Sequence, residues 1–207
     1  LTSMVVFDML VVQGHLRAGE QVLITGVTSG VGVTALSMAK ALGANVIGTS
    51  GSQQKLDQLQ RLGLDLGICT REPNFYEAVM KATNSKGVDL VINTVGGSVF
   101  AECIRTLAFQ GRLATVGYVD GVLKADIDIE ALHAKRLTLF GVSNKLRTPE
   151  QRAEAIPEFK RQILPLIEAG KVSPMIYQVF PFEQLVQAKA VMEANQHLGK
   201  IILAGTP

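Results

Sequence analysis

The chain of 207 residues has no tryptophan, few aromatic residues (5%) and only two cysteines. Cys69 and Cys103 lie far apart, and no CxxC pair or cluster of histidine and cysteine suggests a zinc site. Both cysteines fall in or beside apolar segments, so we expect reduced, buried thiols. The sequence therefore predicts a cytoplasmic location and no metal site.

The chain also has few charged residues, which make up 18% of it, and its formal net charge is only +2. No cluster of lysine or arginine interrupts this balance, which argues against nucleic acid or an anionic membrane as a partner. No apolar run approaches the roughly 20 residues that span a bilayer. Val5–Val12 is interrupted by Asp8 and follows no charged segment, so it does not resemble a signal peptide.

No Ser/His/Asp or Cys/His arrangement can be recognised, and we name no catalytic residue. The three histidines are scattered among polar neighbours, where surface positions are expected: His15, His133 and His197. Asp126 and Asp128 alternate with apolar residues, which predicts a strand-like or looped exposed face rather than a pair of catalytic carboxylates.

Gln21–Ser52 is the most informative stretch of the sequence. Residues 22–24 and 45–49 predict strands, and residues 33–42 predict a helix between them. Three glycines lie where the first strand must turn tightly into that helix: Gly26, Gly30 and Gly32. Strand, glycine turn, helix and strand form the first unit of a dinucleotide-binding sheet.

Later strands are predicted at 66–69, 90–93, 111–116 and 137–142, with helical segments between them. This alternation predicts an α/β fold, a Rossmann doubly wound parallel sheet of six strands in the order 3-2-1-4-5-6. Beyond it, Thr148 can cap a long helix that Pro157 and Pro165 should kink. The end of the chain predicts a strand, a helix and a final strand at 176–180, 182–194 and 200–203.

The glycine turn suits phosphate because the first N–H groups of a helix lack internal partners and carry partial positive charge. The contacts predicted there are Thr28, Ser29, Gly30 and Val31. The same turn also fits the TGxxxGxG motif of short-chain dehydrogenases, which need a Tyr-x-x-x-Lys pair. We reject that alternative because the residues four positions after the three tyrosines are Met80, Val122 and Pro181.

The end of the second predicted strand bears on the choice of cofactor. Sites for NAD place a carboxylate there to hold the ribose diol, whereas this chain has Ser50. Gly51 and Ser52 follow, and Lys55 offers a cation one turn into the next helix. Arg71, after the third strand, is a second candidate cation. These residues predict NADP(H) rather than NAD(H).

Several strings resemble the zinc-independent medium-chain reductases, specifically quinone oxidoreductases of the zeta-crystallin type. They are AKALGANVIGTSGSQQK at 39–55, VDLVINTVGG at 88–97, GRLATVGY at 111–118, QILPLIEAGKV at 162–172 and MEANQHLGKIIL at 192–203. The resemblance covers essentially the whole chain, although Gly26 and Ser29 depart from the family's AxxGxxG turn. It implies a cofactor domain at 1–172 and a tail at 173–207 that would complete an N-terminal GroES-like substrate domain absent from this chain.

The resemblance also implies roles for individual residues. Lys55 would contact the 2′-phosphate, and Thr70 stands where the family often has a tyrosine. The remaining implied cofactor contacts are Thr94 after the fourth strand, Gly117 and Tyr118 along the nicotinamide half, Phe140 and Val142 near the carboxamide, and Lys200 near the end of the chain.

The activity implied is hydride transfer from NADPH to a quinone or an activated, enone-type double bond, and the fragment alone should be poorly active. Two alternatives stay open: a non-catalytic structural or RNA-binding protein of the crystallin type, and an enoyl reductase module of a larger synthase. The apolar segment 137–143 predicts a sheet edge that pairs across a two-fold axis, so we expect a homodimer.

Overall fold

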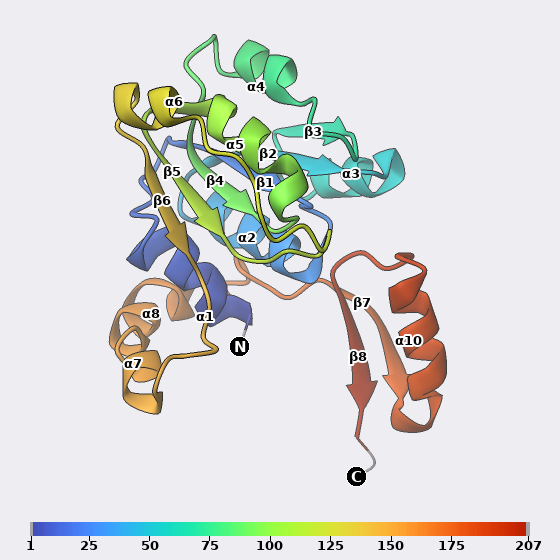
Figure 1. Cartoon of the computed structure of the whole chain (residues 1–207). Helices are drawn as coiled ribbons and strands as arrows, with labels where there is room; N and C mark the ends of the chain where they lie inside the picture. The colour runs from blue at the N-terminus through green and yellow to red at the C-terminus, as the bar shows by residue number, and fades with distance from the viewer. Residues whose placement is uncertain (1, 206–207) are drawn as a thin grey trace.

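The computed structural model describes residues 2–205 and confirms the predicted sheet. Six parallel strands lie in the order β3-β2-β1-β4-β5-β6 (Figure 1). Over these residues the strands are β1 (Gln21–Thr25), β2 (Asn45–Ser50), β3 (Leu66–Cys69), β4 (Val88–Asn93), β5 (Leu107–Thr115) and β6 (Thr138–Gly141). The order and the parallel pairing define a Rossmann fold.

Apolar side chains cover both faces of the sheet, which is why its strands are nearly continuous hydrophobic runs. In β1, Val22 and Ile24 join one buried cluster and Leu23 joins the other. The first cluster includes α1 (Thr2–Phe7), its π-helical continuation η1 (Asp8–Val12), α2 (Gly30–Ala41) and α3 (Gln53–Gln60). The second includes α4 (Tyr76–Ala82), α5 (Phe100–Thr106), which follows the short helix η2 (Gly97–Val99), and α6 (Ile129–Ala134).

The centre of the sheet is where the chain reverses its direction of winding. Strands β1 and β4 are neighbours, and Thr25 at the end of β1 pairs with Asn93 at the end of β4. The helices that follow these two strands lie on opposite faces, which opens a crevice beyond the carboxyl ends of the strands. Ligands of doubly wound sheets bind at such a switch point.

The predicted long helix after residue 148 is instead three short helices. They are α7 (Pro149–Ala153), α8 (Ile156–Gln162) and α9 (Leu164–Glu168). Thr148 caps α7 as predicted, while Pro157 and Pro165 lie in the first turns of α8 and α9. Because proline lacks the N–H that an interior helical bond needs, each proline begins a new helix.

A second, two-stranded parallel sheet ends the chain. It pairs β7 (Ile176–Pro181) with β8 (Lys200–Ala204), and η3 (Phe182–Gln184) with α10 (Leu185–Glu193) joins the two strands. This unit stands beside the main sheet, at the red end of Figure 1. The two strands and the helix agree with the sequence prediction.

Two further features differ from the expectations. The helix α6 was not predicted; Asp128, at the end of the alternating segment, accepts the N–H of Ala131 and caps it. Cys69 was expected to be buried but is exposed, because it ends the edge strand β3. Within residues 2–205, no helix has both the length and the apolar character needed to cross a bilayer.

The two thiols should therefore differ sharply in reactivity. Cys103 is fully buried, and this burial together with the charge of Glu102 raises its thiol pKa far above the usual range. We expect Ellman's reagent to label one thiol in the native protein and two in denaturant, with Cys69→Ser removing the native signal. Equal labelling rates for Cys103 and Cys69 in the native protein would contradict the structure.

Candidate nucleotide-binding site

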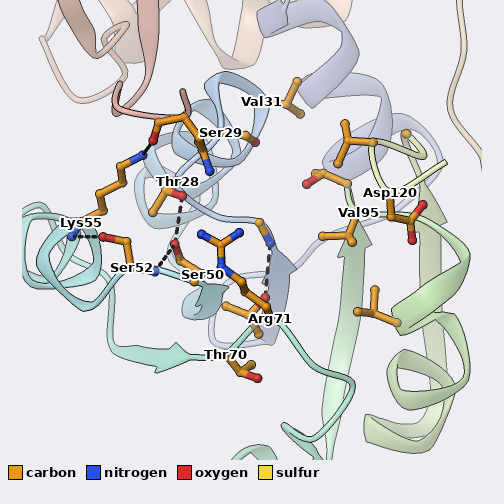
Figure 2. A pocket seen from close by; sticks show the side chains of 18 of the residues that line it. Thr28, Ser29, Val31, Ser50, Ser52, Lys55, Thr70, Arg71, Val95 and Asp120 are labelled. Atoms are coloured by element: carbon orange, nitrogen blue, oxygen red, sulfur yellow. Dashed lines mark hydrogen bonds between the residues drawn. The ribbon is translucent and has the colours of Figure 1, made fainter. Parts of the chain in front are cut away.

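A cavity of about 940 Å³ lies over the carboxyl ends of β1, β2 and β4, at the switch point (Figure 2). Its walls come from the glycine turn, the β2–α3 loop, the residues after β3, β4 and β5, and the segment between α10 and β8. The cavity thus joins residues from six separate parts of the chain, and most of those parts were predicted from the sequence.

The glycine turn forms the floor of the cavity. Gly26 has a φ of +63°, and a Cβ at Gly32 would lie 2.6 Å from the carbonyl oxygens of Gly26 and Val27. Ser29 caps α2 by accepting the N–H of Gly32 at 3.0 Å. The N-terminus of α2, a helix of twelve residues, therefore faces the cavity with its partial positive charge.

Hydroxyl groups line the end of β2, where a carboxylate would stand in a site built for a ribose diol. The Ser50 hydroxyl lies 3.1 Å from that of Thr28 and accepts the N–H of Ser52 at 3.3 Å. Ser52 in turn caps α3 through the N–H of Lys55. The side chains of Thr28, Ser50 and Ser52 at the end of β2 are neutral.

Arg71 is a cation that lines this corner of the cavity. A Cβ at Gly51 would lie 2.4 Å from its Nε, so the arginine side chain rests directly on the glycine backbone. Among the side chains drawn in Figure 2, the Arg71 guanidinium has no hydrogen-bond partner. Glu72 follows it and also lines the cavity; its side chain is exposed, and its backbone carbonyl accepts bonds from the Thr70 hydroxyl and the Asn74 N–H. The guanidinium is therefore available to an anionic ligand.

Lys55 also lines the cavity, but its ammonium is already engaged. It donates to the carbonyl oxygens of Asn195 at 2.6 Å and His197 at 2.7 Å. Partial burial and the nearby charge of Arg71 lower the pKa of Lys55. Sequence reasoning expected this lysine to meet the cofactor, and the structure places it between the cavity and the C-terminal segment.

A network of buried polar groups fixes the turn after β4. The Asn93 side-chain oxygen accepts bonds from Thr25, Val95 and Gly96, and its amide donates to the Gly96 carbonyl at 2.9 Å. The Thr94 hydroxyl donates to the carbonyl of Thr25 at 2.7 Å. Thr94, a predicted cofactor contact, thus lines the cavity, while its hydroxyl donates its hydrogen bond to β1.

Asp120 holds the loop after β5 against this turn. Its carboxylate accepts the N–H and the hydroxyl of Ser98, at 2.9 and 2.6 Å, and the N–H of Val122 at 2.9 Å. A Cβ at Gly96, whose φ is +135°, would lie 2.0 Å from the same carboxylate. Partial desolvation opposes ionisation of Asp120, but the bonds from Ser98 and Val122 outweigh it and lower the pKa.

All but three of the predicted cofactor contacts line the main cavity. Those that do are Thr28, Ser29, Gly30, Val31, Ser50, Gly51, Ser52, Lys55, Thr70, Thr94, Gly117 and Lys200. Tyr118, which is 65% exposed, and Val142 line an adjoining cavity of about 600 Å³ that shares Gly117 with the first. Phe140 lines neither cavity, because its side chain packs against the core.

Sequence reasoning missed three contributors to the site. Asn93 was quoted only as part of a motif, although an asparagine that ends a buried strand before a glycine signals a turn built by its side chain. Asp120 follows the Gly117–Tyr118 pair and could have been found as an acidic residue in a glycine-bounded loop. The carbonyls of Asn195 and His197 left no signal, because any residue supplies a backbone carbonyl.

This geometry defines a Rossmann nucleotide-binding domain, and the similarity to known proteins narrows the class further. The chain belongs to the zinc-binding dehydrogenase family, whose model matches residues 30–161. A nicotinamide cofactor follows from that family and this fold.

Three similar proteins illustrate the range of the family. A phenolphthiocerol/phthiocerol polyketide synthase from Mycobacterium tuberculosis is 31% identical over 92% of this chain, which spans 9% of that protein. Quinone oxidoreductase-like protein 2 of Bos taurus is 30% identical over 91% of this chain and 54% of its own length. The crystal structure of CurK enoyl reductase has a TM-score of 0.83 and 26% identity, covering 100% of this chain and 60% of that chain.

The chain therefore spans about half the length of the bovine relative and a small part of the synthase. Within residues 2–205, no group of three or more histidine, cysteine or acidic side chains could hold a metal ion. Independence of zinc stays a prediction.

Replacing Asp120 with alanine should loosen the loop after β5 and leave the sheet intact. We expect the amide exchange rates of Ser98 and Val122 to rise about five- to tenfold, because each loses its acceptor. Because the carboxyl pKa is lowered on folding, the contacts are fully present above the ordinary pKa of 3.8 and are lost as the pH falls through the lowered value.

Hydrogen exchange measured by NMR at neutral pH tests this, with Asp126→Ala in the same loop as the matched control. Unchanged exchange at Ser98 and Val122 in Asp120→Ala would show that the carboxylate does not hold the loop.

Proposed function

We propose that this chain is the cofactor-binding part of an NADPH-dependent oxidoreductase that transfers hydride to an activated carbon–carbon double bond or a quinone. The observation that carries the proposal is the corner beyond β2, where Arg71 faces serine hydroxyls and no carboxylate ends the strand. A 2′-phosphate would meet positive charge and hydrogen-bond donors there, whereas a carboxylate at the end of β2, as in sites for NAD, would repel it.

The pyrophosphate of the cofactor fits the N-terminus of α2. A Cβ at Gly30 would lie 3.2 Å from the Lys200 ammonium and 3.4 Å from the Gly199 carbonyl, so the absence of a side chain leaves room at the helix end. Gly30 and Val31 occupy the first turn of that helix, where N–H groups lack internal partners. We propose that these N–H groups and Lys200 hold the pyrophosphate.

The 2′-phosphate fits between Ser50, Ser52 and Arg71. A guanidinium can offer two parallel N–H groups to a phosphate, and here it is already positioned by packing on Gly51. Lys55 contributes positive potential to the same corner, although two of its three donors are used by backbone carbonyls. Arg71 is therefore our first candidate for selecting NADP(H).

The bound nicotinamide supplies the hydride, and the residues of this chain bind and orient it. The adjoining cavity begins at Gly117 and continues past Tyr118 to Val142, which gives the nicotinamide half a path away from the phosphate corner. The loop that Asp120 holds forms part of this wall. No residue of this chain is assigned a proton-transfer role.

The similar proteins bear on the substrate. Two of them are a polyketide synthase and an enoyl reductase, which favours an enoyl-type double bond, while the bovine relative keeps a quinone as the second candidate. NADPH oxidation with a crotonyl thioester and with a benzoquinone, by protein containing this chain, separates the two. If the protein oxidises NADPH with neither substrate, that result would contradict the proposed reductase activity.

Three further properties are proposed with this function. Residues 1–172 would form the cofactor domain, and residues 173–207 would complete a GroES-like substrate domain. The apolar side chains of Ile176 and Val179 on β7 are about half exposed, which is expected of a surface that packs against another domain. A homodimer through the exposed edge strand β6 and a cytoplasmic location also stay predictions.

Arg71→Met should raise the Kd for NADPH about tenfold or more, because a charged hydrogen bond to phosphate is lost. The Kd for NADH should change less than about twofold, since NADH has no phosphate at that corner. Fluorescence titration of both nucleotides measures this, and Arg61→Met, an exposed arginine at the end of α3, is the matched control. Equal weakening of both nucleotides by Arg71→Met would remove Arg71 from the phosphate site.

A further inference from the structure

The loops that follow β5 and β6 carry apolar side chains that stand largely in solvent. Val119 in the first loop is 85% exposed, and Leu146 in the second is 92% exposed. Strands β5 and β6 are neighbours, and Thr115 pairs with Gly141 at their carboxyl ends (Figure 1). Both loops therefore leave the same edge of the sheet, and both line the second cavity, of about 600 Å³. We call Tyr118, Val119 and Leu146 the apolar rim of this cavity.

The second cavity suits an uncharged, apolar ligand. Among the described residues that line it, none is charged, and the polar side chains are the hydroxyl groups of Thr115, Tyr118 and Ser143. It shares Val116 and Gly117 with the nucleotide cavity, so it opens from the proposed path of the nicotinamide half. Its volume is that of a small-molecule site. A ligand held here would adjoin the group that donates the hydride.

The loop that carries Val119 is fixed by the next residue, Asp120. The Asp120 N–H donates to the Val95 carbonyl at 3.1 Å. Its carboxylate accepts the N–H groups of Ser98 and Val122, both at 2.9 Å. These bonds tie the loop to the turn after β4. The valine is therefore exposed on a backbone that is already held in one place.

The loop that carries Leu146 is anchored in the same way by the next residue, Arg147. Its guanidinium lies 3.7 Å from the carboxylate of Asp8, a buried residue of η1. The guanidinium also donates to the Asn144 side chain at 3.5 Å and to the Gln151 carbonyl. An apolar side chain on an anchored loop loses little conformational freedom when a ligand covers it, which favours binding.

A third cavity, of about 300 Å³, continues this surface on the other side of Tyr118. It shares Gly117 and Tyr118 with the second cavity. The apolar side chains of Phe100 and Ile127 form part of its wall, and the exposed Lys124 also lines it. A chain that is too long for the second cavity can therefore continue along apolar surface past Tyr118.

We propose that the apolar rim binds an apolar chain carried by the hydride acceptor, so that the protein prefers acceptors with a long chain to short ones. This inference rests on the proposed function for the hydride transfer itself. It narrows the acceptor within that function to a long-chain enoyl thioester or a quinone that carries an alkyl chain. Val119 and Leu146 are then residues that determine specificity.

The first test compares acceptors by chain length, using NADPH and protein that contains this chain. The value of kcat/KM should be about tenfold higher or more for a 2-octenoyl thioester than for a crotonyl thioester, because the longer chain buries more apolar surface. A benzoquinone with a decyl chain and one without it form the second series, and the series that shows the preference identifies the acceptor.

Two results of this comparison have different meanings. Equal kcat/KM for short and long chains in both series would overturn the inference and leave the proposed function standing. Failure to oxidise NADPH with any acceptor of either series would instead contradict the proposed function.

The second test changes the rim. Leu146→Ser and Val119→Ser should each lower the ratio of kcat/KM for the octenoyl and crotonyl thioesters about three- to tenfold, because a hydroxyl replaces apolar contact surface. Leu146→Met keeps that surface and should keep the ratio. Leu62→Ser, at an exposed leucine after α3, is the matched control. An unchanged ratio in both rim variants would show that the rim does not bind the chain.

The same variants distinguish a substrate chain from another domain as the occupant of the rim. If Leu146 and Val119 packed against another domain, both serine variants would lower the unfolding temperature and reduce kcat/KM for both thioesters by the same factor. That result would overturn the inference. We expect the unfolding temperature to stay within about 2 °C of the wild-type value, because substitutions at exposed positions change stability little.

Discussion

The close approach of backbone segments around the glycine turn is the constraint on which the rest of the site depends. A Cβ at Gly48 of β2 would lie 2.6 Å from the Val27 side chain, and one at Gly26 would lie 2.8 Å from the Thr94 hydroxyl. The turn is therefore fitted between the ends of β2 and β4, with little free volume on either side. This fit aims the N-terminus of α2 at the cavity and brings the serine hydroxyls of β2 and the asparagine network of β4 to its rim.

Much of this arrangement could be predicted from the sequence, because its causes are local or periodic. The strand order follows from alternating strands and helices, and the caps at Ser29, Ser52 and Thr148 follow from residue type and position. The site residues on the turn and beyond β2 follow from the same pattern, since the carboxyl ends of adjacent parallel strands share one edge of the sheet. Helix α6 was not predicted, because Asp128, which caps it, ends a segment whose alternating pattern indicates a strand or loop.

The rest could not be predicted because it depends on contacts between distant segments. Lys55 and Arg71 look alike in sequence as cations near a phosphate corner, yet one is bound to carbonyls about 140 residues later and the other packs on Gly51. Exposure of Cys69 depends on β3 being an edge strand that ends at the surface, which an apolar sequence alone does not reveal. Tertiary contacts thus give different surroundings to two residues that the local sequence pattern treats as equivalent.

The central claim is that the corner beyond β2 selects a 2′-phosphate, and parallel titration of the wild-type protein with NADPH and NADH tests it most directly. A single phosphate held by a guanidinium and hydroxyl groups should make NADPH bind about tenfold tighter or more. That preference should shrink at high salt, because the added interaction is partly ionic. Equal affinities, or tighter binding of NADH, would contradict the account.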